Sequence, residues 1–188
     1  MPFDITNTQA RPHNHQVHFY SGDAALVESV ANFVIAALIA GSAAITFATK
    51  PHRDNVLQAL KLQGVDIDAA IEQGAYVSLD AADTLSTFMI NDWPDAGRFF
   101  EGFKNLIESA SNAAKAKHPR VVIFGEGVAL LWAEGKRKAA MRLEQLGNDL
   151  AGTRKVDILC AYPLHLHIKE DRHSFEAISA EHSAVHSR

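Results

Sequence analysis

Residues 120–135, RVVIFGEGVALLWAEG, decide the fold of this chain. Four apolar residues run directly into Gly125, and the carboxylate of Glu126 follows at once. Bulky, β-branched side chains in a short run that ends at glycine are typical of a strand covered on both faces of a sheet. Residues 127–132 then have the composition of a helix. We therefore expect Glu126 to lie just past the end of a buried strand.

Glu126 has two interpretations. In open α/β sheets, ligands bind in the crevice beyond the carboxyl ends of the strands, which makes an acid at this point a candidate binding residue. A carboxylate at a helix start also interacts favourably with the helix dipole, by roughly 0.3–1 kcal/mol, without any role in binding. The spacing alone leaves both interpretations open.

The rest of the sequence alternates strand patterns with helical patterns. The expected strands are residues 15–20, 43–48, 75–79, 121–124 and 156–161. The other expected helices are residues 24–40, 51–63, 65–74, 83–91, 99–114, 137–150 and 174–185. Each connection is long enough to cross over a sheet. This order predicts an α/β, three-layer domain whose mostly parallel central sheet has about five or more strands.

Composition narrows the class of protein. The 188 residues suit one domain, and 47% hydrophobic content is enough for a sizeable core. We expect a flexible arm over residues 1–14 and a single domain over residues 15–188. A net charge of -4 provides no basic field for nucleic acid. Without a signal segment or an uninterrupted apolar span, and with Cys160 as a small core residue, the sequence indicates a cytoplasmic protein that does not enter a membrane.

Sequence signatures of catalysis are missing. There is no G-x-x-x-x-G-K-[ST] phosphate loop, and an acid, Asp23, follows the first expected strand where phosphate would need amides and a lysine. Residues 125–127, GEG, begin a dinucleotide fingerprint, but Leu130 stands where its third glycine belongs. No G-x-S-x-G elbow is found. We expect neither enzyme activity nor a cofactor.

Ten histidines raise the question of a metal site. They include two sequence clusters in polar segments that we expect to be exposed: His13, His15 and His18, and His165, His167 and His173. No cysteine and no HExxH helix completes either set, so we expect no metal. His182 differs, because it shares a helical stripe with Phe175, Ile178 and Val185. It suits a hydrogen-bonded core histidine, with contact to a ligand as the alternative.

Polar and aromatic residues follow each expected strand. They are Tyr20, Asp23, Thr49, His52, Asp80, Glu126 and Tyr162. In a parallel sheet these positions converge on one rim, and their mixture suits a small organic ligand better than phosphate. Each residue alone also fits a cap or a turn, so the convergence carries the hypothesis. Glu126 and His52 are the expected polar contacts, with Tyr20, Trp132 and Tyr162 as apolar walls.

Several ordered motifs add a resemblance. They are HQVHFY (15–20), AT-x-PHR (48–53), LDAADTLSTFM (79–89), GEGVALLWAEG (125–135), RLEQL-x-N (142–148), LCAYP (159–163) and F-x-x-I-x-x-x-H-x-x-V (175–185). Together they resemble the MEDS family, the sensory domain of methanogen and methylotroph regulators that is named after the dichloromethane-responsive repressor. The resemblance covers roughly residues 13–186. The positions that fall on the family pattern are His15, Tyr20, His52, Asp80, Glu126, Trp132 and His182.

The chain also departs from that pattern. Gly127 stands where methionine is common, Lys136 where asparagine is common, and Gly147 where tryptophan is common. Loss of the large ring at position 147 would either enlarge a pocket or remove a packing contact. The identity of a family ligand therefore does not transfer to this chain.

The resemblance implies a fold similar to the RecA/KaiC-like ATPases without a working phosphate loop. It also implies the sensing part of a histidine kinase or transcriptional regulator. We expect a non-catalytic sensory domain that binds a small organic ligand at the rim and acts through such a partner or as a homodimer, with Tyr20, Thr49, His52, Asp80, Glu126, Trp132, Tyr162 and His182 as its site. The alternatives are a degenerate nucleotide-binding protein without hydrolysis and a ligand-free interaction module.

Overall fold

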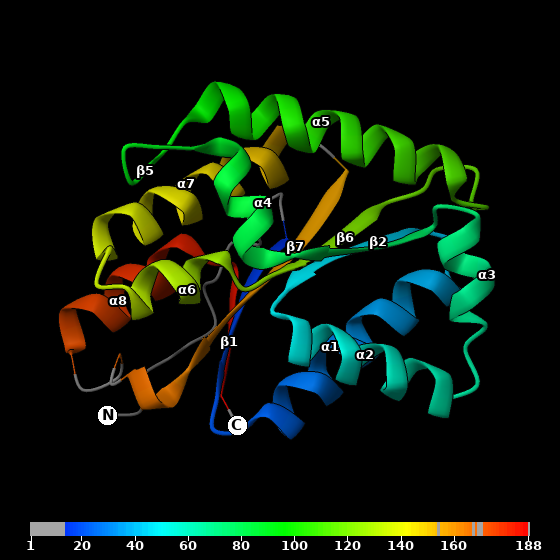
Figure 1. Ribbon diagram of the computed structural model, residues 1–188, viewed down its shortest axis with the longest axis horizontal. Helices are drawn as coiled ribbons and strands as arrows, with labels where there is room; N and C mark the ends of the chain where they lie inside the picture. The colour runs from blue at the N-terminus through cyan, green and yellow to red at the C-terminus, as the bar shows by residue number, and fades with distance from the viewer. Residues whose placement is uncertain (1–13, 154, 167, 169–170, 188) are drawn as a thin grey trace, which may run out of the picture.

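A six-stranded sheet runs through the centre of the molecule (Figure 1). The computed structural model describes residues 14–153, 155–166, 168 and 171–187. In spatial order the strands are β3 (Tyr76–Asp80), β2 (Ala43–Ala48), β6 (Val121–Gly125), β7 (Val156–Pro163), β1 (Asn14–Tyr20) and β8 (Ala184–Ser187). Every neighbouring pair is parallel. The expected arm, residues 1–14, lies outside the described residues except for Asn14, which begins β1.

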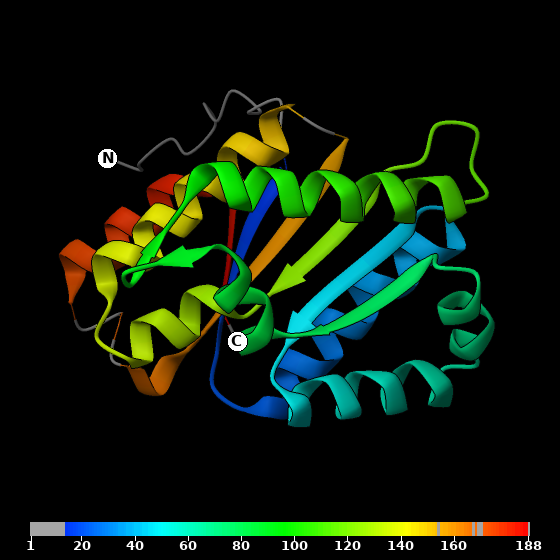
Figure 2. The same cartoon turned by 45° about the horizontal axis from the view of Figure 1, so that its top comes forward.

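Helices cover both faces of the sheet. One face carries α1 (Asp23–Ile39), α2 (Lys50–Leu62) and α3 (Ile67–Glu72). The other carries α4 (Ala81–Phe88), α5 (Ala96–Ala113), α6 (Gly127–Ala133), α7 (Arg137–Thr153) and α8 (Arg172–Glu181), and a short 3-10 turn, η1 (Leu164–Leu166), follows β7. Figure 2 shows α5 running across this second face. The predicted three-layer α/β domain with a parallel sheet is confirmed.

The central strand β6 explains the layered core. All five of its residues are buried. Val121 and Ile123 pack into the apolar core beneath α4 to α8, whereas Val122 and Phe124 pack into the core beneath α1 and α2. Alternate side chains of a strand point to opposite faces, so an unbroken apolar run is what a strand with helices on both sides requires.

Two predicted helices end earlier than expected. The helix expected over residues 83–91 stops at Phe88, and a two-residue strand, β4 (Met89–Ile90), pairs antiparallel with β5 (Trp93–Pro94). The connecting residues Asn91 and Asp92 have φ values of 49° and 61°. Asn and Asp tolerate this left-handed conformation, and it produces the tight turn that a two-residue hairpin loop needs.

The final helix is the second correction. It ends at Glu181, and the following residues form β8 beside β1 instead of continuing the helix. Ser183 closes the connection, because its N–H and its hydroxyl both donate to the His15 carbonyl, at 2.6 and 2.9 Å. Val185 is therefore on the edge strand and 43% exposed, not on a buried helical stripe. Pairing with β1 outweighs the helical spacing of the sequence.

No helix within the described ranges is long and apolar enough to cross a membrane.

Gly125→Ala should destabilise the fold by about 1–3 kcal/mol, because overpacking a filled core costs that much. A Cβ at this position would lie 2.3 Å from Cζ of Phe47, whose ring is itself packed against Phe103. Urea unfolding measures the change. Gly102→Ala is the matched control: no atom lies within 4 Å of its added Cβ, and alanine in the α5 interior should raise stability by up to about 1 kcal/mol. Equal stability of Gly125→Ala and the parent would contradict the close packing.

Candidate functional site

Glu126 joins the ends of two neighbouring strands. Its side chain is buried, and it follows β6 where β6 pairs with β2. Oε2 accepts a 2.7 Å hydrogen bond from the backbone N–H of Thr49, and Oε1 is hydrogen-bonded to Nδ1 of His52. Thr49 precedes α2 and His52 lies in its first turn. The carboxylate thus contacts the N-terminus of α2, where the helix dipole favours negative charge, and makes no capping bond to its own helix α6.

His52 lies between two carboxylates. Its Nε2 is 3.3 Å from Oδ1 of the exposed Asp23, while Glu126 holds Nδ1. The hydrogen bond with Glu126 raises the pKa of His52 above its usual range, burial opposes this, and Asp23 adds to it. Tyr20 approaches the ring edge-on, with centroids 6.4 Å apart. Burial and the charges of Glu126 and Asp23 raise the pKa of the Tyr20 phenol, so it remains protonated.

Asp80 extends this edge toward β3. Its Oδ2 is 3.1 Å from Nη2 of Arg53, and its Oδ1 accepts the first backbone N–H groups of α4. The hydrogen bond from the Asp83 amide contributes most to a lowered pKa of Asp80. Arg53 follows His52 directly in α2. The structure therefore brings five of the expected residues to one edge: Tyr20, Thr49, His52, Asp80 and Glu126.

A groove of about 640 Å³ opens beside Asp80, between α4 and α5. Its apolar wall includes Phe88, Phe99 and Phe103, and its polar end holds Arg53 and Asp80. Nε of Arg53 is buried and has no hydrogen-bond partner among the described residues. The groove thus combines an aromatic wall with the guanidinium of Arg53 in its lining. The sequence analysis missed Arg53, although it follows His52 in the same helical turn.

Trp132, Tyr162 and His182 belong to a second set of contacts, beneath α7. The Tyr162 hydroxyl donates to Oε1 of Glu144 at 2.7 Å, and Trp132 packs edge-on against the Tyr162 ring. Arg137 covers the Trp132 ring at 5.3 Å from its centroid. Glu144 is the common partner of Tyr162 and His182.

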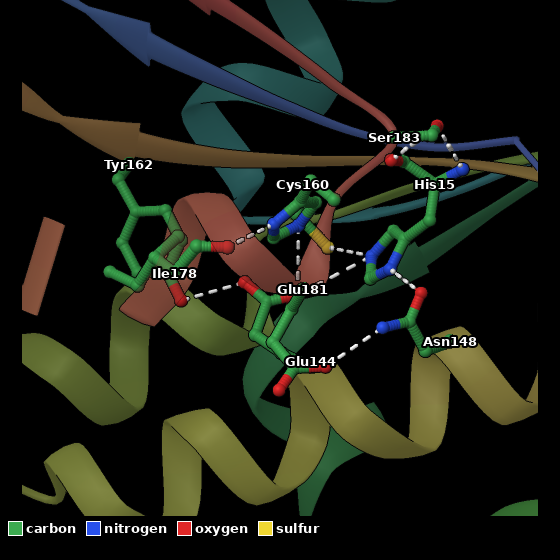
Figure 3. A network of polar contacts seen from close by, with 9 residues as sticks. His15, Glu144, Asn148, Cys160, Tyr162, Ile178, Glu181 and Ser183 are labelled. Carbon is green, nitrogen blue, oxygen red and sulfur yellow. Dashed lines mark hydrogen bonds and ion pairs between the residues drawn. The ribbon is translucent and has the colours of Figure 1, made fainter. Parts of the chain in front are cut away.

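We name His15, Glu144, Cys160 and His182 the buried histidine cluster. Figure 3 labels His15, Glu144 and Cys160 of this cluster. Oε2 of Glu144 lies 3.4 Å from Nε2 of His15 and 3.2 Å from Nε2 of His182. Sγ of Cys160 lies 3.4 Å from Nε2 of His15. Burial alone would raise the pKa of Glu144, but the facing His182 and His15 hold it below its usual range. Burial and the Glu144 charge raise the pKa of the Cys160 thiol.

This cluster corrects the expected exposure of the N-terminal histidines. His15 and His18 are buried in β1, whereas His165 and His173 are exposed. His13 and His167 lie outside the described residues. Sequence reasoning missed Glu144 as well. Its one signal is spacing: Glu144 continues the stripe of small buried residues in α7 that contains Ala140, Gly147 and Ala151.

The glycine at position 147 lies against this cluster. A Cβ there would be 3.2 Å from Cε1 of His15, and Gly147 also borders a small apolar cavity of about 30 Å³. Gly127 is equally enclosed, since its Cβ would be 3.1 Å from Leu85. Lys136 forms ion pairs of 2.7 Å with Asp92 and Glu134. At position 147, the missing side chain leaves room for the His15 ring.

His52→Gln should remove part of the pH dependence of stability above pH 6.5. Because the pKa of His52 in the folded protein is raised above the ordinary histidine value of 6.5, the stabilisation by His52 is complete below that value and is lost as the pH rises through the folded pKa. Urea unfolding of the parent and the variant at several pH values above 6.5 gives the difference between their free energies of unfolding. The contributions of the other histidines cancel in that difference. Replacing the exposed His118 with Gln is the control. Parallel pH profiles for His52→Gln and the parent would contradict the ion pair with Glu126.

Comparison with known proteins places the chain in a family. A search of curated proteins found no match. A family model described as "MEDS: MEthanogen/methylotroph, DcmR Sensory domain" matches residues 14–181, which include the residues at the sheet edge and all of the second set of contacts except His182. The match spans most of the 188 residues. The chain therefore belongs to the MEDS family of sensory domains.

Proposed function

We propose that this MEDS domain is a non-catalytic sensor that binds a small organic molecule at the carboxyl edge of the sheet and acts through a partner regulator or kinase. The observation that carries the proposal is the groove between α4 and α5. Its volume of about 640 Å³ lies in the range of small-molecule sites, roughly 300–1,000 Å³. Its aromatic wall and few polar groups also have the composition of such sites.

The polar end of the groove indicates the class of ligand. The guanidinium of Arg53 is partly exposed and lines the groove, and Thr84 lines it as well. An oxygen atom on the ligand would accept from this guanidinium, while an apolar body would contact Phe99 and Phe103. We infer an oxygenated organic molecule with an apolar part. Asp80 keeps Arg53 oriented and disfavours a ligand with several negative charges.

Adjacent residues connect the groove to the buried acid. His52 and Arg53 are consecutive in the first two turns of α2, and Glu126 holds His52 and the start of that helix. A ligand that accepts a hydrogen bond from Arg53 therefore acts on the same helical segment that Glu126 holds in place. Ligand binding would in this way change the position of α2, and a partner protein bound to α2 or α4 would respond to that change. A second copy of the chain in a homodimer could take the place of this partner.

A nucleotide is the weaker alternative. In a related nucleotide-binding fold, phosphate would meet the turn between β1 and α1, at a helix N-terminus. Here Asp23 occupies the first turn of α1, and its carboxylate repels phosphate. Its contact with His52 reduces that charge only in part. We therefore propose that the chain is similar to the RecA/KaiC-like ATPases in fold but does not hydrolyse nucleotides.

Arg53→Gln should weaken ligand binding about ten- to a hundredfold, the size of a lost hydrogen bond to a charged group. The test uses a panel of short-chain carboxylates, ketones, alcohols and aromatic acids, with ATP and Mg²⁺ alongside. Thermal shifts identify compounds that stabilise the parent, and titration calorimetry then gives the affinity of each variant. Lys61→Gln, an exposed residue at the other end of α2, is the control and should bind like the parent.

Glu126→Gln should keep the fold and reduce the ligand-induced thermal shift, because the helix segment behind Arg53 is held less firmly. A response to ATP and Mg²⁺ but to none of the organic compounds would favour the nucleotide alternative. A dimer with no response to any compound would favour a ligand-free interaction module. Equal affinities of Arg53→Gln and the parent would remove the groove from the proposal.

A further inference from the structure

We propose that the buried histidine cluster is a tetrahedral site for one divalent metal ion of the zinc class. Four donor atoms converge: Nε2 of His15, Oε2 of Glu144, Sγ of Cys160 and Nε2 of His182 all lie within 4.8 Å of one another. They come from β1, α7, β7 and the residue after α8. Cysteine, histidine and glutamate are the residue types that bind zinc. The inference is independent of the ligand groove.

The spacing of the donors fits a single ion. Atoms bound to one tetrahedral zinc at about 2.0–2.3 Å lie roughly 3.3–3.8 Å from one another. The three measured separations, His15 to Glu144, His182 to Glu144 and His15 to Cys160, are 3.4, 3.2 and 3.4 Å. Three of the six edges of such a tetrahedron therefore already have about the required length, and the remaining pairs of donor atoms lie within 4.8 Å.

Each imidazole has its other nitrogen engaged. Nδ1 of His182 donates to the Ile178 carbonyl at 2.7 Å. Nδ1 of His15 faces Oδ1 of Asn148 at 3.2 Å, and the Asn148 amide is oriented by its own bond to Glu181 at 2.8 Å (Figure 3). In a neutral imidazole this leaves a lone pair on Nε2. Metal-binding histidines are held in this manner, by a carbonyl or carboxylate behind the ring.

Two buried atoms in the cluster face each other without a further partner. Nε2 of His182 and Oε2 of Glu144 lie 3.2 Å apart, and neither makes a hydrogen bond to another group among the described residues, although both side chains are 0% exposed. A lone pair facing a carboxylate oxygen is unfavourable without a positive charge between them. A metal ion satisfies both atoms at once. The second oxygen of Glu144 stays with the Tyr162 hydroxyl, which fixes the carboxylate.

Charge selects the class of ion. One thiolate, one carboxylate and two neutral imidazoles carry two negative charges, which a divalent ion neutralises, as a fully buried site requires. The thiolate excludes hard ions such as Mg²⁺ and Ca²⁺, which take oxygen ligands. Four protein donors leave no open position for substrate, so the site would be structural. It would tie the first strand to α7, β7 and the end of α8.

The test uses the full chain without a polyhistidine tag. After growth in zinc-supplemented medium, and separately after refolding with Zn²⁺, elemental analysis and native mass spectrometry should find about one metal ion per chain. Refolding with Co²⁺ should give the visible absorption of tetrahedral cobalt with a thiolate charge-transfer band. Cys160→Ala should lose that band. A strong chelator should lower the Tm of the parent but leave that of the variant unchanged.

Further variants separate donors from supporting residues. Asn148→Ala removes only the group behind His15, so it should keep one cobalt ion per chain with roughly 10–100-fold weaker affinity. His173→Ala, an exposed histidine of α8, should bind metal like the parent. The proposal is overturned if the parent takes up less than a tenth of an equivalent after both treatments. That result would make His182 and Glu144 an internal imidazolium–carboxylate pair. Equal cobalt spectra of the parent and Cys160→Ala would overturn it as well.

Discussion

The contact between Glu126 and the start of α2 is the constraint on which the edge of this domain depends. It links β6 to the helix that follows β2, across strands that are already paired. A buried carboxylate is tolerated only when both oxygens are engaged, and here a backbone amide and an imidazole fulfil that requirement. The positions of His52, Arg53 and the groove beyond them all follow from where this helix begins. The Phe47 ring packs over Gly125 at the same junction and leaves no space there for a side chain at position 125.

Two polar centres therefore share one sheet and differ in character. The pair of Glu126 and His52 lies at the edge, where the partly accessible His52 is next to the exposed Asp23. The buried histidine cluster lies in the interior, with the His15, Glu144 and His182 side chains at 0% exposure. The first has the accessibility that ligand recognition needs. The second has the burial and the convergent donors of a structural centre. Separate roles for them are consistent with a sensory domain whose core stays rigid while one edge responds.

Much of this architecture could be read from the sequence. The strand over residues 121–124 was predicted from its apolar run, and the meeting of His52 with Glu126 follows from parallel strands ending at one edge. The sixth strand could not be found this way, because Val185 continues the helical spacing of Phe175, Ile178 and His182, and its pairing with β1 joins residues that are far apart in the sequence. The groove depends on how α4 packs against α5, which no local pattern reports.

The buried histidine cluster was hidden for a different reason. Cys160 has the surroundings of an ordinary core residue, and Glu144 has those of a polar residue in an amphipathic helix. Their common site depends on which helical turn of α7 faces β1 and β7, and that is decided by packing over long sequence separations. Proximity along the chain instead suggested His13 and His18 as partners for His15. The actual partner, His182, is near the other end of the sequence.

That separation has a consequence for the order of assembly during synthesis. Among the described residues, β1 pairs with β7 and β8 alone, so its partners leave the ribosome more than a hundred residues later. At translation rates of about 5–20 residues per second, β1 waits on the order of 7–30 s with both edges unpaired. Meanwhile β2, β3 and β6 can already associate, since they are neighbours in space and nearer in sequence. The side of the sheet that contains β7, β1 and β8 thus forms last, and β1 is the segment that most needs protection from other chains in the meantime.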